Sequence, residues 1–243
     1  MSQIVAASPH VTTKNSTAVI MRDVLIALLP AVLAGCVVFG LRALLVVAVT
    51  TAACVFFEWG FEKLCHTPST ISDLSAAVTG VLLAMNLPVS IPLWQAVFGA
   101  LVAIVAVKGL FGGIGKNFAN PAITARIVMF LAFSKSMTAW VFPDAVSSAT
   151  PLAMMANGES VDYLTLLLGN HGGCLGETSA LALLIGFAYL LIRGVISWHT
   201  PVCFVGTVFV MSLILGQDAV GQILSGGLML GAIFMATDYT TSP

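Results

Sequence analysis

Long apolar runs separated by short polar segments dominate this chain. The runs lack the strict alternation of barrel strands, and backbone polar groups in lipid must be paired within the spanning segment, so helices are the expected spans. Some runs hold only about 14 residues, fewer than the roughly 20 that cross a bilayer, so interrupted helices are expected, one of them over residues 101–108. Eight spans are predicted, near residues 24–39, 43–59, 74–87, 94–107, 121–133, 179–192, 202–215 and 224–236.

The composition supports a polytopic, all-α membrane protein. Hydrophobic residues make up 59% of the chain and charged residues 8%, whereas a soluble domain carries about 25% charged residues. The net charge is −1 without a basic run, which argues against nucleic acid as a partner. The cysteines form no C-x-x-C pair, so no metal or iron–sulfur site is expected. The first apolar run begins only after Arg22 and Asp23, which indicates an uncleaved span rather than a signal peptide.

The distribution of basic residues predicts the orientation of the chain. No Lys or Arg occurs between Ser136 and Ile192. By the positive-inside bias, the polar loop in this stretch lies outside the cell and the N-terminus lies in the cytoplasm, in a multi-pass protein of the plasma (inner) membrane. Arg126 falls within an apolar run, where a charge is costly unless it faces a partner or a polar ligand. Arg126 is therefore a site candidate, with structural pairing to a carboxylate or a helix-end carbonyl as the alternative.

An internal repeat is expected at an offset of 151 residues. Because the first copy holds five spans, the second copy would enter the membrane in the opposite orientation, and such inverted repeats commonly place a ligand or ion path at their interface. Counterparts of residues 94–133 would fall at about 245–284, so the second five-helix unit is expected to be truncated. At this offset Gly35 matches Gly186, Arg42 matches Arg193 and Gly80 matches Gly231.

This reasoning gives the expected organisation of the chain. A cytoplasmic segment precedes the first membrane repeat, an extracytoplasmic loop follows that repeat, and the incomplete second repeat ends the chain. The expected boundaries are residues 1–22, 23–135, 136–177 and 178–243.

A hydroxyl-rich motif, Asp144-Ala-Val-Ser-Ser-Ala-Thr-Pro151, lies in the external loop. Thr150 is a suitable N-cap and Pro151 a suitable first residue of a helix. Asp144 and Ser147 suit a turn whose side chains bond backbone amides. Local chemistry alone thus explains the motif structurally, and a functional role competes with that explanation.

Two further segments carry candidate chemistry. Residues 112–122 join a glycine-rich loop to a helix that Asn120 could cap, and such a helix start attracts anions or carbonyl oxygens. A re-entrant turn that only closes helix packing explains this segment equally well, and its spacing is not that of a P-loop. Asp238, near the last residues, is either a solvated helix end or part of a cofactor pocket.

Four ordered motifs resemble one family. They occupy residues 112–122, 144–152, 172–182 and 235–243, and they are similar to the D subunit of the Rnf complex and to the related B subunit of sodium-pumping NADH:quinone oxidoreductase. The resemblance implies an FMN attached to Thr150 through a phosphoester bond by a dedicated flavin transferase. Family members also continue for two further spans.

The resemblance gives the neighbouring residues possible roles. Asp144 and Ser147 would order the loop around Thr150 or be read by the transferase, and Ser148 stands where family members often have Gly. A second, noncovalent flavin, either riboflavin or FMN, is implied between spans. The candidates for its pocket are Asn120, Arg126 and Asp238.

The sequence therefore predicts a flavin-bearing membrane subunit that is not active alone. Its complex would couple ferredoxin:NAD oxidoreduction to sodium or proton movement, and its partners would be Rnf subunits A, B, C, E and G together with membrane lipid. The redox chemistry would belong to the flavin, and the protein would supply its orientation and electrostatics. Two alternatives stay open: a transporter or channel without its own redox group, and a purely structural subunit of such a complex.

Overall fold

A computed structural model describes residues 16–140, 150–169 and 171–238. Within these ranges the chain is mostly helical and forms no strand, although an isolated antiparallel bridge joins Pro88 to Cys174. Two long helices, α1 (Thr17–Phe39) and α2 (Leu41–Cys65), begin the fold and are joined through Gly40. The φ of +71° at Gly40 favours glycine, because side chains are disfavoured in the left-handed region.

Shorter helices complete the first half of the fold. A buried helix, α3, packs along α2, and α4 continues without a break into η2, which is π-helical. The bounds in this half are η1 (Ile71–Asp73), α3 (Ser75–Met85), α4 (Leu93–Leu101), η2 (Val102–Gly109), α5 (Pro121–Ala132) and α6 (Ser134–Met137).

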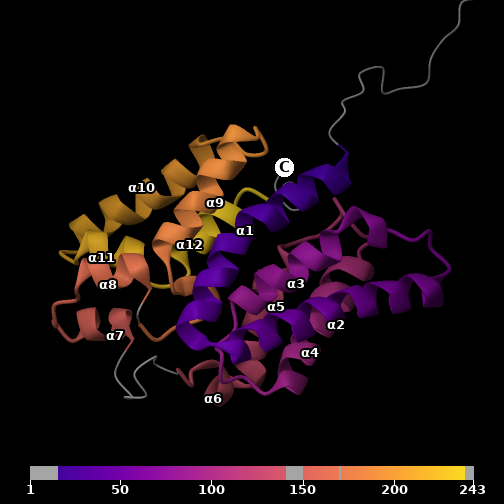
Figure 1. Ribbon diagram of the computed structural model, residues 1–243, viewed down its shortest axis with the longest axis horizontal. Coiled ribbons are helices and arrows are strands. Elements are labelled where there is room, and N and C mark those ends of the chain that lie inside the picture. Colours follow the sequence, from indigo (N-terminus) through magenta and orange to yellow (C-terminus); the bar gives the residue numbers. More distant parts are fainter. Residues whose placement is uncertain (1–15, 141–149, 170, 239–243) are drawn as a thin grey trace, which may run out of the picture.

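The second half lies beside the first, with α1 between them (Figure 1). Two short helices, α7 and α8, pack against α11, while α9 packs along α1. The bounds in this half are α7 (Pro151–Ala156), α8 (Tyr163–Leu168), η3 (Leu175–Glu177), α9 (Ala180–Ile192), α10 (His199–Ile214), α11 (Ala219–Leu224), α12 (Leu228–Leu230) and η4 (Gly231–Met235), of which η4 is π-helical.

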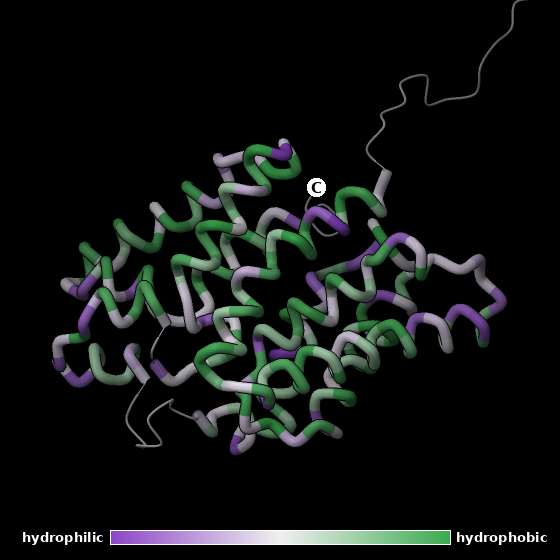
Figure 2. The backbone as a smooth tube through the Cα atoms, viewed as in Figure 1, coloured by the Kyte–Doolittle hydropathy of each residue, from purple (hydrophilic) through white to green (hydrophobic). Residues whose placement is uncertain are grey.

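The helices carry the features of a membrane protein. Both α1 and α2 are long and apolar enough to cross a bilayer, and several shorter apolar helices accompany them. Many apolar side chains are exposed, among them most of those on α10, and Figure 2 shows hydrophobic residues along the helices, with many of the polar ones at helix ends and in loops. Small residues let helices approach closely. A Cβ on Gly186 would lie 2.2 Å from the carbonyl oxygen of Ala27, at the crossing of α9 and α1.

The structure confirms helices at the predicted spans and corrects one of them. The interruption expected over residues 101–108 is not present, because α4 continues there as the π-helical η2 up to Gly109. The predicted span at 224–236 is wrong at its start, since Leu224 ends α11 and the next helix begins at Leu228. Gly226, with a φ of +67°, lies in the turn between them. The start of α7 was expected at Thr150 and Pro151, whereas the short helices α6, α8 and α11 were not predicted, because their few residues lie outside the long apolar runs or at their edges.

Candidate functional site

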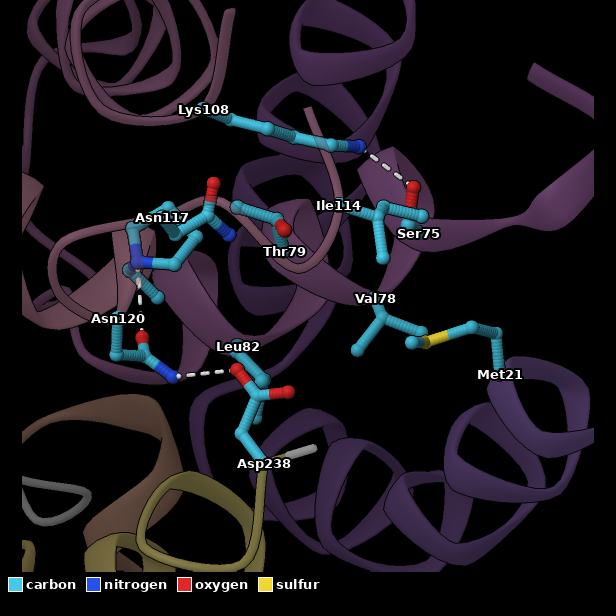
Figure 3. A pocket seen from close by; sticks show the side chains of 12 residues that line it. Met21, Ser75, Val78, Thr79, Leu82, Lys108, Ile114, Asn117, Asn120 and Asp238 are labelled. Carbon is cyan, nitrogen blue, oxygen red and sulfur yellow. Dashed lines mark hydrogen bonds between the residues drawn. The ribbon is translucent and has the colours of Figure 1, made fainter. Parts of the chain in front are cut away.

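A small cavity with both polar and apolar lining residues forms where α5 begins. Asn120 caps this helix, since its Oδ1 accepts hydrogen bonds from the backbone nitrogens of Ala122 (3.0 Å) and Ile123 (3.2 Å). Its Nδ2 donates to Oδ2 of Asp238 at 3.1 Å (Figure 3). The predicted cap is confirmed, and two of the predicted site residues lie together although 118 positions separate them.

The walls of this Asn120 cavity bring in a buried ammonium group. Its polar lining includes Ser75, Thr79 and Lys108 as well as Asn120 and Asp238 (Figure 3). The cavity offers about 30 Å³ to water, room for roughly two molecules. A small-molecule site usually measures at least about 300 Å³, so a flavin does not fit this cavity in its present shape, although the amides, hydroxyls and charges could bond one.

Lys108 belongs to an ionic cluster that the sequence did not point out. It lies on η2, only 4% exposed, and donates hydrogen bonds to Oε1 of Glu58 on α2 and, at 2.5 Å, to Oγ of Ser75 on α3. Ser75 in turn donates to Asp73 at 2.5 Å. A charge within a membrane helix is held in place by such partners. The sequence signal that could have predicted this pair was Glu58 within the second apolar run and Lys108 at the end of the fourth.

A second cavity lies on the other side of Lys108. It measures about 240 Å³, and its lining includes Glu58, Glu62 and Thr70. Glu62 accepts hydrogen bonds at Oε1 from the backbone nitrogen (2.8 Å) and Oγ1 (2.5 Å) of Thr70. The Oε2 atoms of Glu58 and Glu62 are buried and receive no hydrogen bond from the described residues. Lys108 thus forms part of the wall of both cavities.

Arg126 joins a different cluster. On α5, it donates to Oδ1 of Asn86 at 2.7 Å, to Oε1 of Glu177 at 3.4 Å and to Sγ of Cys174 at 3.5 Å. Asn86 follows α3 and also donates to the carbonyl oxygen of Leu82 at 2.7 Å. The structural pairing of Arg126 with a carboxylate is therefore present. Arg126 does not line the Asn120 cavity, so the three residues expected in one flavin pocket are divided between two places.

Thr150 lies at the start of α7 and is partly exposed. As the predicted N-cap, it accepts a 3.4 Å hydrogen bond at Oγ1 from the backbone nitrogen of Ala153, and Pro151 is the first helical residue. The helix is docked on the second half of the fold, since a Cβ on Gly221 of α11 would lie 2.4 Å from Sδ of Met155. The other residues predicted in this motif, Asp144, Ser147 and Ser148, lie outside the described residues.

The segment after α7 is polar and well bonded. Asp162 caps α8 by accepting from the backbone nitrogen of Leu164 (3.3 Å) and from Oγ1 of Thr165 (2.8 Å), and the bond from Thr165 is the main cause that lowers the pKa of Asp162. Tyr163 donates its phenolic hydrogen to Oδ2 of Asp218 at 2.9 Å, which raises the pKa of Tyr163. The bond between Tyr163 and Asp218 holds α8 to the start of α11, next to an open cleft of about 650 Å³.

Comparisons with known proteins support the resemblance seen in the sequence. The family described as NQR2, RnfD, RnfE matches residues 4–243. The D subunit of the Na(+)-translocating ferredoxin:NAD(+) oxidoreductase complex of Acetobacterium woodii is 47% identical, over 98% of this chain and 78% of the relative. The proton-translocating counterpart from Clostridium ljungdahlii is 36% identical, over 98% and 79%. The D subunit of the ion-translocating oxidoreductase complex of Halorhodospira halophila is 35% identical, over 100% and 81%.

Proposed function

The chain belongs to the NQR2, RnfD, RnfE family, and from this membership we propose that it acts as the D subunit of an ion-translocating ferredoxin:NAD oxidoreductase complex. The observation that carries the proposal is the 47% identity to such a subunit over 98% of this chain. The protein is then one membrane part of a translocase-type oxidoreductase and is not active alone. Its partners are the other Rnf subunits, A, B, C, E and G, and the membrane lipid around its exposed apolar helices.

Within that complex, we propose that the chain carries an electron-transferring FMN on Thr150. The hydroxyl of Thr150 is partly exposed on a short surface helix, so a flavin transferase could reach it without unfolding the membrane helices. Its oxygen would form the phosphoester bond, and the bound flavin would supply the redox chemistry. The residues of α7 would fix the direction in which the attached flavin extends from Thr150. A second, noncovalent flavin stays a prediction from the sequence, because the Asn120 cavity has no room for one as it stands.

The intact mass of the chain tests the flavin directly. The full chain, expressed with the flavin transferase of its native host, should carry the mass increment of one FMN. Thr150→Val should lack that increment, whereas Thr165→Val, which removes the hydroxyl of another partly exposed threonine on the neighbouring helix α8, should retain it. An unmodified wild-type chain from the native host would refute the flavin and leave the alternatives of a transporter without a redox group or a structural subunit.

The placement of Thr150 outside the cell is also a proposal. It is supported by the charge distribution, because the sequence from Ser136 to Ile192 contains no Lys or Arg. An impermeant thiol reagent should modify Asn157→Cys in intact cells, since Asn157 is exposed at the end of α7. In that variant Cys203 is replaced by Ser and the native, exposed Cys65 serves as the internal control, because Cys65 should react only after lysis. Reaction of both cysteines only after lysis would contradict the proposed orientation.

We also propose an inverted repeat, which is supported by the order of the helices in the two halves. At the predicted offset of 151, α2 and α3 correspond to residues 192–216 and 226–236, which hold α10 and the pair α12 and η4. The counterpart of α1 is 168–190, and α9 overlaps only its second half. Inverted repeats meet near the middle of the membrane, often through interrupted helices. In this fold Nδ2 of Asn86, directly after α3, lies 3.9 Å from Sδ of Met235, the last residue of η4. This contact between the two short helices supports a pseudo-twofold relation between the halves.

A further inference from the structure

An open cleft lies between the short helices α7 and α8 and the turn that leads into α11. Its lining includes Met155, Gly158 and Tyr163 from α7, the loop after it and α8, and Gln217 and Gln222 from the turn before α11 and from α11 itself. Its volume of about 650 Å³ falls within the range of roughly 300–1,000 Å³ that is typical of small-molecule sites. Figure 1 shows α7 and α8 next to α11 in the second half of the fold. The lining combines the loop between α7 and α8 with the turn before α11, and the packing of α7 and α8 on α11 holds these segments together.

Thr150 and the cleft occupy opposite ends of the same helix. Thr150 caps the start of α7, and Met155 lies close to its end. A helix of six residues is about 9 Å long, a span comparable to the ribityl phosphate chain of FMN. The contact of Met155 with α11 holds this helix in place. A flavin tethered at the start of α7 therefore has the reach to place its ring beside the residues at the other end.

The lining of the cleft suits a planar ring with a polar edge. Gln222 Nε2 donates to Oε1 of Gln217 at 3.4 Å, and the two amides together keep further donors and acceptors for a pyrimidine edge. Met155 contributes a polarizable thioether, which packs well against aromatic rings. The ring of Tyr163 is held by its 2.9 Å hydrogen bond to Asp218, so an aromatic surface is already fixed in the wall. The carboxylates of Glu159 and Asp218 lie at this end of α7, away from the phosphate at Thr150.

We propose that the isoalloxazine ring of the FMN on Thr150 lies in this cleft, in contact with Tyr163. The inference rests on the proposed function, because it requires the covalent flavin. It adds the place of the ring and the residues that hold it. Burial of a large aromatic ring removes apolar surface from water, which favours the docked position over a ring that extends freely into solvent. The tether supplies specificity for this one flavin, since the ring is already confined close to the cleft.

Flavin fluorescence tests the contact with Tyr163. A phenol in contact with an excited isoalloxazine ring quenches it by electron transfer, whereas the phenyl ring of phenylalanine does not. The fluorescence of the covalent FMN should therefore rise several-fold in Tyr163→Phe. Tyr189→Phe is the matched control, because Tyr189 also donates its hydroxyl to a carboxylate, that of Asp23, but it lies on α9 and does not line the cleft. The full chain with its flavin is used throughout, and the Thr150→Val chain supplies the fluorescence background.

The intact mass separates this inference from the proposed function. If the FMN increment is present and only Tyr163→Phe raises the fluorescence, the docked ring is supported. If the increment is present and Tyr163→Phe leaves the fluorescence unchanged, or Tyr189→Phe raises it equally, the ring does not lie against Tyr163 and the inference is wrong while the flavin on Thr150 stands. If the increment is absent from the wild-type chain, the proposed function fails and this inference fails with it.

Discussion

Two of the basic residues on the apolar helices, Lys108 and Arg126, form ion pairs in very different surroundings. Lys108 is 4% exposed, and its partner Glu58 is 5% exposed; both belong to the first half of the fold. The side chain of Arg126 is 32% exposed, that of its partner Glu177 is 12% exposed, and this pair joins the first half to the second. Helices that pack on the Lys108–Glu58 pair enclose it, whereas the Arg126–Glu177 pair links the two halves of the fold through a longer nitrogen–oxygen distance. A buried charge that loses its partner is more costly than a partly exposed one, so the two pairs should respond unequally to mutation.

The largest effect is expected from breaking the enclosed pair. Lys108→Met leaves the carboxylate of Glu58 buried without its cation, which should destabilise the protein by about 3–5 kcal/mol. Thermal unfolding in detergent, followed by tryptophan fluorescence, measures the loss. The double variant Lys108→Met/Glu58→Gln removes both charges and should recover part of the stability.

The control for this variant is an exposed lysine. Lys116→Met removes a basic residue in the loop after η2 and should change the stability by less than about 0.5 kcal/mol. If Lys108→Met lowered the stability no more than Lys116→Met does, the enclosed pair would not contribute more to the free energy of unfolding than an exposed lysine, and the contrast with the linking pair would be wrong.

A smaller effect is expected at the linking pair. Arg126→Leu removes the donor to Oδ1 of the buried Asn86 and to Oε1 of Glu177, and an unsatisfied buried polar group costs about 1–3 kcal/mol. Arg126→Lys keeps the charge but cannot donate to both partners through one planar group, so it should fall between the wild type and the leucine variant. Both variants should keep the FMN on Thr150. An Arg126→Leu protein that is less stable than Lys108→Met would reverse the order of the two pairs.

A smaller loss of stability is expected from mutation of Asn120, which lines the Asn120 cavity. Asn120→Ala loses both the helix cap and the bond to Asp238, and the loss of a cap alone costs about 0.5–2 kcal/mol. Asn120→Asp keeps an acceptor for the cap but replaces the donor to Asp238 with a second carboxylate. If the hydrogen bond between Asn120 and Asp238 stabilises the fold in addition to the cap, Asn120→Asp should also lower the melting temperature. An Asn120→Asp protein with wild-type stability would assign the whole effect to the cap.

The contrast between these sites also shows what the sequence could predict. The spans and the caps at Asn120 and Thr150 follow from local patterns, because apolar runs and N-cap residues act within a few positions. The pairing of Lys108 with Glu58 joins positions 50 residues apart, and the π-helical η2 that carries Lys108 leaves no clear pattern. Arg126 was a candidate because of its cost in lipid, yet its partners depend on how α3, α5 and η3 pack. Tertiary packing therefore decided what local patterns could not.

The smallest effect on stability is expected where the chemistry is proposed. Thr150 is partly exposed, and its cap bond is long at 3.4 Å on a helix of only six residues, so Thr150→Val should change the free energy of unfolding by no more than about 0.5 kcal/mol. The same variant should lose the FMN completely, because valine has no hydroxyl to esterify. Intact mass and thermal unfolding, measured on one preparation, check both statements. Thr150→Ser retains a hydroxyl and is the control for the backbone position. A large drop in melting temperature without flavin loss would mean that Thr150 serves packing, as the buried charges do.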